Sequence, residues 1–197
     1  AFGDSLFHFL KRCVDQHIAK VSDISALDQE LAEQEAFLSQ KVANFFGRED
    51  SLVLVDEYLA GGGDFPNQPL VIYGPSGIGK SALLAKVVER TRSHGFHVVF
   101  RFVGATPNSS SSRSLLTSLC QECAAASDSR LTFEDQGDPF SDFSLRVAHF
   151  LEDLRSPIVL VIDALDQLVN NDELLWLPEN LPPGLKIVIS VLNDPNY

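Results

Sequence analysis

The sequence feature that most constrains the fold is a glycine-rich segment between an apolar run and a helix-forming run. It reads Gly74-Pro75-Ser76-Gly77-Ile78-Gly79-Lys80-Ser81 and matches G-x-x-x-x-G-K-[S/T] at every fixed position. Its three glycines allow a tight curl in which successive backbone N–H groups face inward. The alternative, a plain glycine turn before a helix, is disfavoured by the strand and helix on either side. The segment therefore predicts a loop that wraps phosphate groups.

This geometry gives individual residues of the loop distinct expected roles. The helix that begins near Lys80 presents its positive N-terminal end to the ligand. The Lys80 ammonium should reach the β- and γ-phosphates of a nucleotide, and the Ser81 hydroxyl should bind Mg²⁺. The expected ligand-binding set is Gly74, Pro75, Ser76, Gly77, Ile78, Gly79, Lys80, Ser81 and Ala82.

A second signal is the apolar run at residues 158–162, which ends in Asp163. The carboxyl end of a buried parallel strand is where open α/β sheets collect their ligand-binding groups. Asp163 is therefore a candidate for the Mg²⁺ site and for catalysis, with helix capping as the alternative. Asp166 follows three residues later. It could orient an attacking water, assist the metal or cap the next helix, and the spacing leaves these readings open.

The rest of the chain alternates β-rich and helical runs. Strands are predicted at residues 69–73, 97–103, 157–162 and 185–192. Helices are predicted at residues 50–60, 80–93, 114–126 and 141–155, the last with Ser141 as its N-cap. Strands that alternate with helices favour an α/β fold whose parallel sheet is covered on both faces. That arrangement is a three-layer αβα sandwich.

Two regions are expected along the chain. Residues 1–45 are predicted to form a pair of helices, an N-terminal extension or linker. Leu27, Leu31 and Leu38 lie on one stripe of the second helix, which either packs on the main domain or binds a partner. Residues 46–197 are predicted to form the nucleotide-binding domain.

Composition narrows the possible partners and compartment. The chain has 15 Lys and Arg against 27 Asp and Glu, a formal charge of −12. This excess of acid argues against nucleic acid and anionic membranes as partners. No apolar run is long enough to span a bilayer, and no signal peptide is expected.

Three cysteines fit the reducing cytoplasm. The pair Cys120-x-x-Cys123 lacks the second pair that a zinc site needs, and packed thiols are expected instead.

Three segments together resemble one protein family. They are Gly47-Arg48-Glu49 before a short helix, the glycine-rich loop, and residues 161–166, Val-Ile-Asp-Ala-Leu-Asp. These segments resemble the STAND class of P-loop NTPases, whose Walker A and Walker B motifs the last two match. Within that class the chain is most similar to NACHT-type ATPase domains of nephrocystin-3-like and other repeat-bearing proteins. The resemblance covers about residues 45 to 192.

The resemblance implies further details of the fold and the site. ATP with Mg²⁺ would be the ligand, Phe46 and Arg48 would lie near the adenine, and Ser190 would act as a sensor of the γ-phosphate. For Arg48 the alternative is a surface salt bridge, and for Ser190 a strand-end hydroxyl. The implied ASCE-type strand order is 2-3-4-1-5, with the fourth strand between the two Walker strands. The family's fifth strand, helical domain and winged-helix domain would follow Tyr197, so a sheet truncated after its fourth strand is expected.

Three functions are compatible with these features. The first is a signalling or scaffold switch that binds ATP and hydrolyses it slowly, with protein partners or self-assembly in the full-length protein. The second is an interaction module that binds nucleotide without turnover, since Gln167 stands where many relatives carry an acid. The third is a small-molecule kinase, which the acidic segment at residues 127–138 disfavours because a lid over a triphosphate should be basic.

Overall fold

The structure is a computed structural model that describes residues 11, 25–64, 66–107, 109–127, 131–168 and 174–192. The first helix predicted within residues 1–45 lies, apart from Lys11, outside the described residues. The second predicted helix is present as α2 (Ala26–Ala43). Ser25 is its N-cap, and the Ser25 hydroxyl accepts a hydrogen bond from the Asp28 amide at 3.1 Å.

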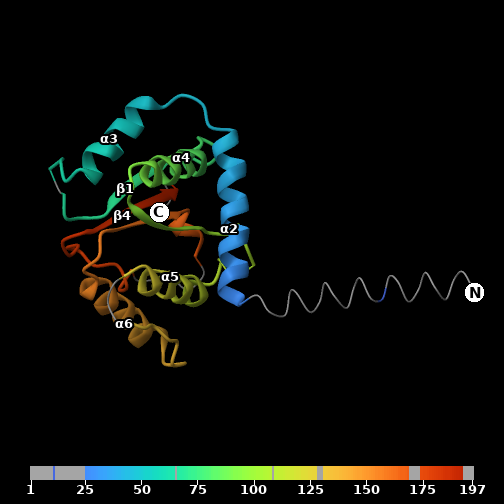
Figure 1. The fold of residues 1–197 in the computed structure, drawn as a ribbon, viewed down its shortest axis with the longest axis vertical. Helices are drawn as coiled ribbons and strands as arrows, with labels where there is room; N and C mark the ends of the chain where they lie inside the picture. Colours follow the sequence, from blue (N-terminus) through green and yellow to red (C-terminus); the bar gives the residue numbers. More distant parts are fainter. Residues whose placement is uncertain are drawn as a thin grey trace, which may run out of the picture.

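Four parallel strands form a single sheet (Figure 1). Their spatial order is β1-β4-β3-β2. Their bounds are β1 (Leu70–Gly74), β2 (His97–Phe102), β3 (Ile158–Asp163) and β4 (Leu185–Leu192). The fourth strand therefore lies between the strand that precedes the glycine-rich loop and the strand that ends in Asp163. The α/β fold class and the implied order of these four strands are confirmed.

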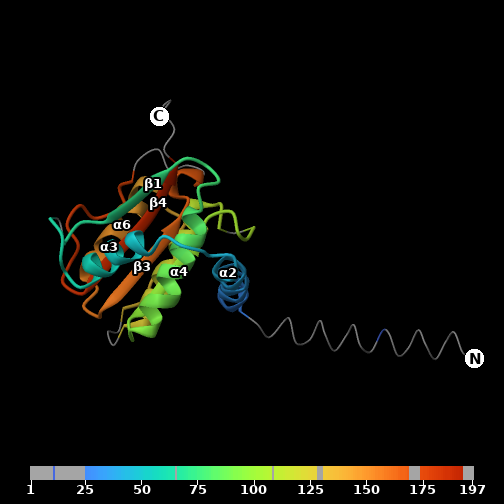
Figure 2. The ribbon, with the colours of Figure 1, turned by 90° about the horizontal axis from the view of Figure 1, so that it is seen from above.

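Helices cover both faces of the sheet (Figures 1 and 2). One face packs against α3 (Glu49–Leu59) and α4 (Lys80–Ser93), and the other packs against α5 (Ser112–Ala126) and α6 (Phe140–Asp153). Alternate residues of β3 enter opposite cores: Val159 and Val161 pack on the α4 side, and Leu160 and Ile162 on the α5 side. The three-layer αβα sandwich is thus confirmed. No described helix is both long and apolar enough to cross a membrane.

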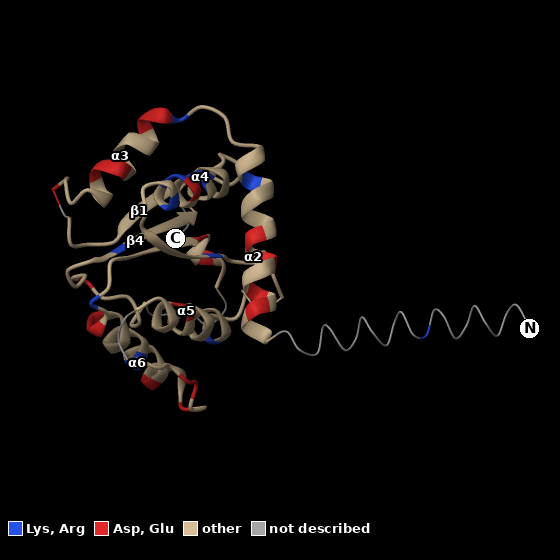
Figure 3. Cartoon of the chain, viewed as in Figure 1, with Lys and Arg blue, Asp and Glu red and all other residues tan. Residues whose placement is uncertain are grey.

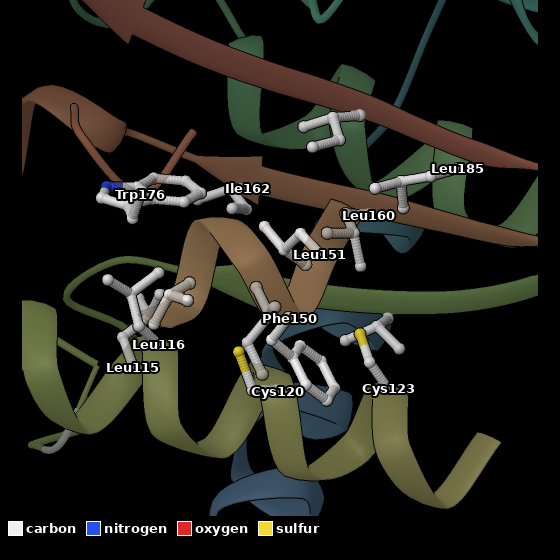
Figure 4. Packing of buried hydrophobic residues seen from close by; sticks show 14 of the residues in the cluster. Leu115, Leu116, Cys120, Cys123, Phe150, Leu151, Leu160, Ile162, Trp176 and Leu185 are labelled. Atoms are coloured by element: carbon white, nitrogen blue, oxygen red, sulfur yellow. The ribbon is translucent and has the colours of Figure 1, made fainter. Parts of the chain in front are cut away.

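The core between the sheet and helices α5 and α6 contains both described cysteines (Figure 4). Cys120 and Cys123 are fully buried free thiols beside Phe150 and Leu151. Burial raises the pKa of both thiols, so they stay protonated and apolar at neutral pH. No group of three or more metal-ligating side chains occurs within the described ranges. The expectation of packed thiols is confirmed.

The structure corrects the predicted start of α6. Ser141 is not its N-cap, because the helix begins at Phe140 and Pro139 occupies the cap position. The Pro139 carbonyl accepts the first helical hydrogen bond from the Phe143 amide at 3.0 Å. The φ of Pro139, −53°, suits a helix start without a capping side chain. The Ser141 hydroxyl instead lies 3.5 Å from Oδ1 of Asp142.

Helix α2 packs against α4 and β2 through Leu38 of the apolar stripe, which is buried, and through a polar contact that the stripe did not predict. Leu27 and Leu31 are only half-buried, whereas Glu30 and Gln34 are buried. The Gln34 amide forms two hydrogen bonds with the backbone of Phe102: it accepts from the N–H at 2.8 Å and donates to the carbonyl at 3.3 Å. β2 is an edge strand of the sheet, and Gln34 pairs two of its backbone groups that no neighbouring strand reaches.

We predict that Gln34→Ala lowers the free energy of unfolding by about 1–3 kcal/mol, because it leaves two buried backbone groups of Phe102 without partners. Urea denaturation followed by circular dichroism measures this loss. Gln40→Ala is the matched control, since Gln40 lies exposed on the same helix. Equal stabilities for the two variants would show that Gln34 does not fix α2 to the sheet.

Candidate functional site

The glycine-rich loop joins the carboxyl end of β1 to the first turn of α4. Gly77 and Gly79 have φ values of 75° and 95°, in the left-handed region that glycine adopts without strain. A Cβ at Gly74 would lie 3.3 Å from Cγ2 of Ile78, a tight contact that the Ile78 side chain would have to relieve by a small shift. Helix α4 has no side-chain cap, so its first-turn N–H groups are available to an acceptor from outside the helix. These features build the inward curl that the sequence predicted.

The Lys80 side chain folds over its own loop. Its Nζ donates hydrogen bonds to the carbonyl oxygens of Gly74 at 2.7 Å and Pro75 at 3.1 Å. An ammonium group has three donors, so a third hydrogen bond remains for an anion above the loop. The two existing bonds hold the positive charge in place before any ligand arrives.

Asp163 and Ser190 form a buried pair at the ends of adjacent strands. Asp163 is 4% exposed, and its Oδ1 accepts a hydrogen bond from the Ser190 hydroxyl at 2.5 Å. The Ser190 oxygen in turn accepts from the Ala164 amide at 2.8 Å. Strand alternation puts both side chains on the α4 face of the sheet, where Val161 and Val188 also pack. Ser190 thereby orients the Asp163 carboxylate. Its role as a γ-phosphate sensor stays a prediction.

Asp166 lies in the short 3-10 helix η1 (Leu165–Gln167) directly after β3. Its Oδ1 accepts a hydrogen bond from the Leu192 amide at 2.8 Å, which ties η1 to the last residue of β4. The side chain does not cap η1. The segment at residues 169–173, which a capping role toward a following helix would involve, lies outside the described residues, and the Asp166 carboxylate is exposed at the cavity described below.

Arg48 crosses over the glycine-rich loop from the start of α3. Its Nη2 donates a hydrogen bond to the Ile78 carbonyl, and its own φ is 63°. It forms no salt bridge with a described carboxylate, so the structure does not support the surface-salt-bridge alternative. Phe46 lies two residues earlier and is 96% exposed. Contact of either side chain with an adenine stays a prediction.

A cavity of about 400 Å³ opens at the carboxyl edge of the sheet. It brings together loop residues and both acids that the sequence predicted: Ser76, Gly77, Gly79, Lys80, Ser81, Ala82, Asp163 and Asp166. Six other predicted residues are not part of its lining: Phe46, Arg48, Gly74, Pro75, Ile78 and Ser190. Of these, Arg48 contacts the loop and Ser190 contacts Asp163.

Five residues that line this cavity were not among the predicted site residues: Lys41, Asn44, Ala164, Gln167 and Leu192. Lys41 and Asn44 come from the end of α2, and Leu192 ends β4. A lysine in the last turn of a helix is common because it complements the helix dipole, so Lys41 gave no distinctive signal. Only the packing of α2 beside α4 brings it to the site.

The donor set of the cavity suits a magnesium-bound polyphosphate. The Ser81 hydroxyl and the Asp163 carboxylate offer oxygen ligands, which Mg²⁺ prefers. Mg²⁺ keeps several waters and shares phosphate oxygens, so two protein ligands suffice. Lys80 and the free amides of α4 provide the positive charge that a polyphosphate needs.

The family model ATPase_2, described as an ATPase domain predominantly from Archaea, matches residues 45–181 of this chain. NACHT and WD repeat domain-containing protein 2 of Homo sapiens is 30% identical over 208 residues, covering 97% of this chain and 12% of that protein. Nephrocystin-3 of Xenopus tropicalis is 30% identical over 138 residues, covering 64% of this chain and 10% of that protein. The chain thus spans only a small part of the length of these relatives.

Among solved structures, AMPPCP-bound DnaA from Aquifex aeolicus matches 79% of this chain and 42% of its own length. The identity is 18% and the TM-score is 0.37.

Proposed function

This chain belongs to the ATPase_2 family of P-loop ATPase domains, and on that premise we propose that it binds ATP with Mg²⁺ as a slowly hydrolysing switch module. The observation that carries the proposal is the convergence of Lys80, Ser81 and Asp163 on one cavity at the carboxyl edge of the sheet. The relatives named NACHT and WD repeat domain-containing protein 2 and nephrocystin-3 support the NACHT-type, STAND-class assignment.

Each residue has a defined part in this proposal. The loop amides and Lys80 bind the phosphates, while Ser81 and Asp163 hold the metal. Bound Mg²⁺ would neutralise phosphate charge as a Lewis acid. Ser190 fixes the carboxylate of Asp163, so the metal ligand needs little reorganisation on binding. Arg48 and Phe46 lie before α3 on the chain, and we propose that they contact the base.

Hydrolysis in this switch depends on Asp166. Gln167 is a neutral amide and cannot act as a carboxylate base, whereas Asp166 offers a second carboxylate at the cavity. A switch also requires that nucleotide bind one conformation better than another. We propose that in the full-length protein this difference controls protein partners or self-assembly in the cytoplasm.

Two alternatives remain from the sequence. A module that binds nucleotide without turnover would share every contact named above and would differ only in its rate of ATP hydrolysis. A small-molecule kinase would need a basic lid, but Arg113 and Arg146 in the region around residues 131–138 are paired with Asp135 and Asp138. The basic groups there are thus engaged with acids of the same chain, which disfavours the kinase.

We also propose the division of the chain into a helical extension at residues 1–45 and a nucleotide-binding unit at residues 46–197. The contacts of α2 with α4 and β2 make this described helix of the extension part of the same packed body.

Calorimetric titration with ATP, ADP and GTP, each with and without Mg²⁺, tests the proposed ligand. We expect ATP to bind more tightly with Mg²⁺ than without it, and GTP to bind more weakly than ATP. Phosphate release under single-turnover conditions then separates the switch from the module without turnover. A higher affinity for GTP than for ATP, or an ATP affinity that does not change with Mg²⁺, would refute the proposed ligand.

A further inference from the structure

We propose that the last turn of α2 is part of the nucleotide site, and that Lys41 binds the terminal phosphate of the bound triphosphate. The inference rests on the proposed function and extends it to a segment that precedes the matched family region, residues 45–181. Lys41 and Asn44 line the same cavity as Lys80, Ser81 and Asp163.

Helix α2 is held firmly enough to place a side chain in this cavity. Glu35 accepts two hydrogen bonds from Arg92 of α4, at 2.9 Å and 3.1 Å, in a bidentate ion pair. The rings of Phe37 and Phe102 pack with centroids 5.0 Å apart. With the Gln34 contact to Phe102, these interactions attach α2 to both α4 and the carboxyl end of β2. Its last turn is therefore a defined wall of the cavity.

The distribution of charge supports a phosphate ligand for Lys41. Most described basic side chains have a carboxylate within 4.0 Å: Lys86, Arg90, Arg92, Arg101, Arg113, Arg146 and Arg155. Within described residues 25–192, no such ion pair with a described carboxylate is formed by Lys41, Arg48, Lys80 or Lys186. Lys186 instead donates a hydrogen bond to the Pro66 carbonyl and does not line the cavity, whereas the other three cations lie at the glycine-rich loop or its cavity.

The immediate neighbours of Lys41 leave its ammonium available. Its Nζ lies 4.8 Å from the centre of the Phe37 ring, a cation–π contact that occupies none of its three N–H donors. The acidic residues of α2 lie along the earlier part of the helix, with the lysine at its end (Figure 3). In a chain of charge −12, a cation without a carboxylate partner at an anion-binding cavity is best explained by an anionic ligand.

The lining indicates which part of the nucleotide Lys41 binds. The cavity contains Asp163, Asp166 and Gln167 but neither Phe46 nor Arg48, the residues proposed for the base. Lys41 therefore lies with the phosphate and metal groups. A cation there would supply, from the same chain, positive charge near the γ-phosphate, where charge changes between ATP and ADP. The position of α2 would then respond to the nucleotide state.

The test compares ATP and ADP affinity by calorimetry in Mg²⁺ for the parent chain, Lys41→Gln, Lys41→Arg and Lys86→Gln. Lys41→Gln should weaken ATP binding about tenfold and ADP binding no more than about twofold, because one charge-assisted hydrogen bond to the γ-phosphate is lost. Lys41→Arg should restore most of the preference for ATP. Lys86→Gln removes a lysine of α4 that is paired with Glu89 and should change neither affinity.

The ratio of the two affinities decides the outcome. A variant that lowers stability reduces both apparent affinities by the same factor, so the ratio still reports the contact with the γ-phosphate. An unchanged ratio in Lys41→Gln, with parent chain and Lys86→Gln binding ATP normally, overturns this inference and leaves the proposed function intact. A parent chain that binds no ATP overturns both.

Discussion

Lys80→Ala is expected to weaken Mg²⁺-ATP binding by about 10- to 100-fold, since hydrogen bonds to a charged group contribute about 1.5–3 kcal/mol. The Lys80 ammonium is held above the loop by the Gly74 and Pro75 carbonyls, and alanine removes that preorganised charge. Calorimetric titration of the variant measures the loss directly. The effect on ADP should be of similar size if Lys80 contacts the β-phosphate as well.

Lys86→Ala is the matched control for this substitution. Lys86 lies on the same helix, and its ammonium pairs with Glu89 rather than with the loop. Its removal should leave ATP affinity within about twofold, because an exposed ion pair contributes little. If Lys80→Ala binds ATP as tightly as Lys86→Ala does, the loop is not the phosphate site.

Asp163→Asn should remove most of the dependence of ATP affinity on Mg²⁺. Asparagine keeps an oxygen that can accept the Ser190 hydrogen bond, so the fold should survive, but it loses the negative charge that the metal requires. Any single-turnover phosphate release should fall by about 10²-fold or more, because metal neutralisation of phosphate charge is worth several kcal/mol. Titrations with and without Mg²⁺ give the first quantity, and rapid quench gives the second.

Asp153→Asn controls for the general loss of one acid from this acidic chain. Asp153 is an exposed residue at the end of α6, distant in sequence from the loop. The Asp153→Asn variant should bind ATP with the same Mg²⁺ dependence as the parent chain. Normal Mg²⁺ dependence in Asp163→Asn would exclude Asp163 from the metal site.

Much of the sheet and the loop could be predicted because local sequence determines them. The strand at residues 185–192 and the helix at residues 80–93 match β4 and α4 at both ends. Gly95, with φ of 83°, follows α4 as expected for a helix terminated by glycine. The order of the strands came from the family resemblance, since periodicity alone does not say which strands are neighbours.

Contacts between distant segments could not be predicted in the same way. Gln34 is a polar residue among leucines, and nothing in α2 shows that its amide will pair with Phe102, 68 residues away. The contact of Arg48 with Ile78 and that of Ser190 with Asp163 likewise depend on how elements pack. Lys41 joins the site for the same reason. Tertiary packing, rather than local propensity, completes the wall of the cavity.

The most direct test of the central claim is to follow the backbone amide resonances of the chain by NMR while Mg²⁺-ATP is added. If the loop amides bind the triphosphate, the largest saturable shifts should come from Gly77, Gly79, Lys80 and Ser81, with one affinity common to all four. Saturable ATP binding that leaves these four amides unperturbed, while residues elsewhere shift, would contradict the account.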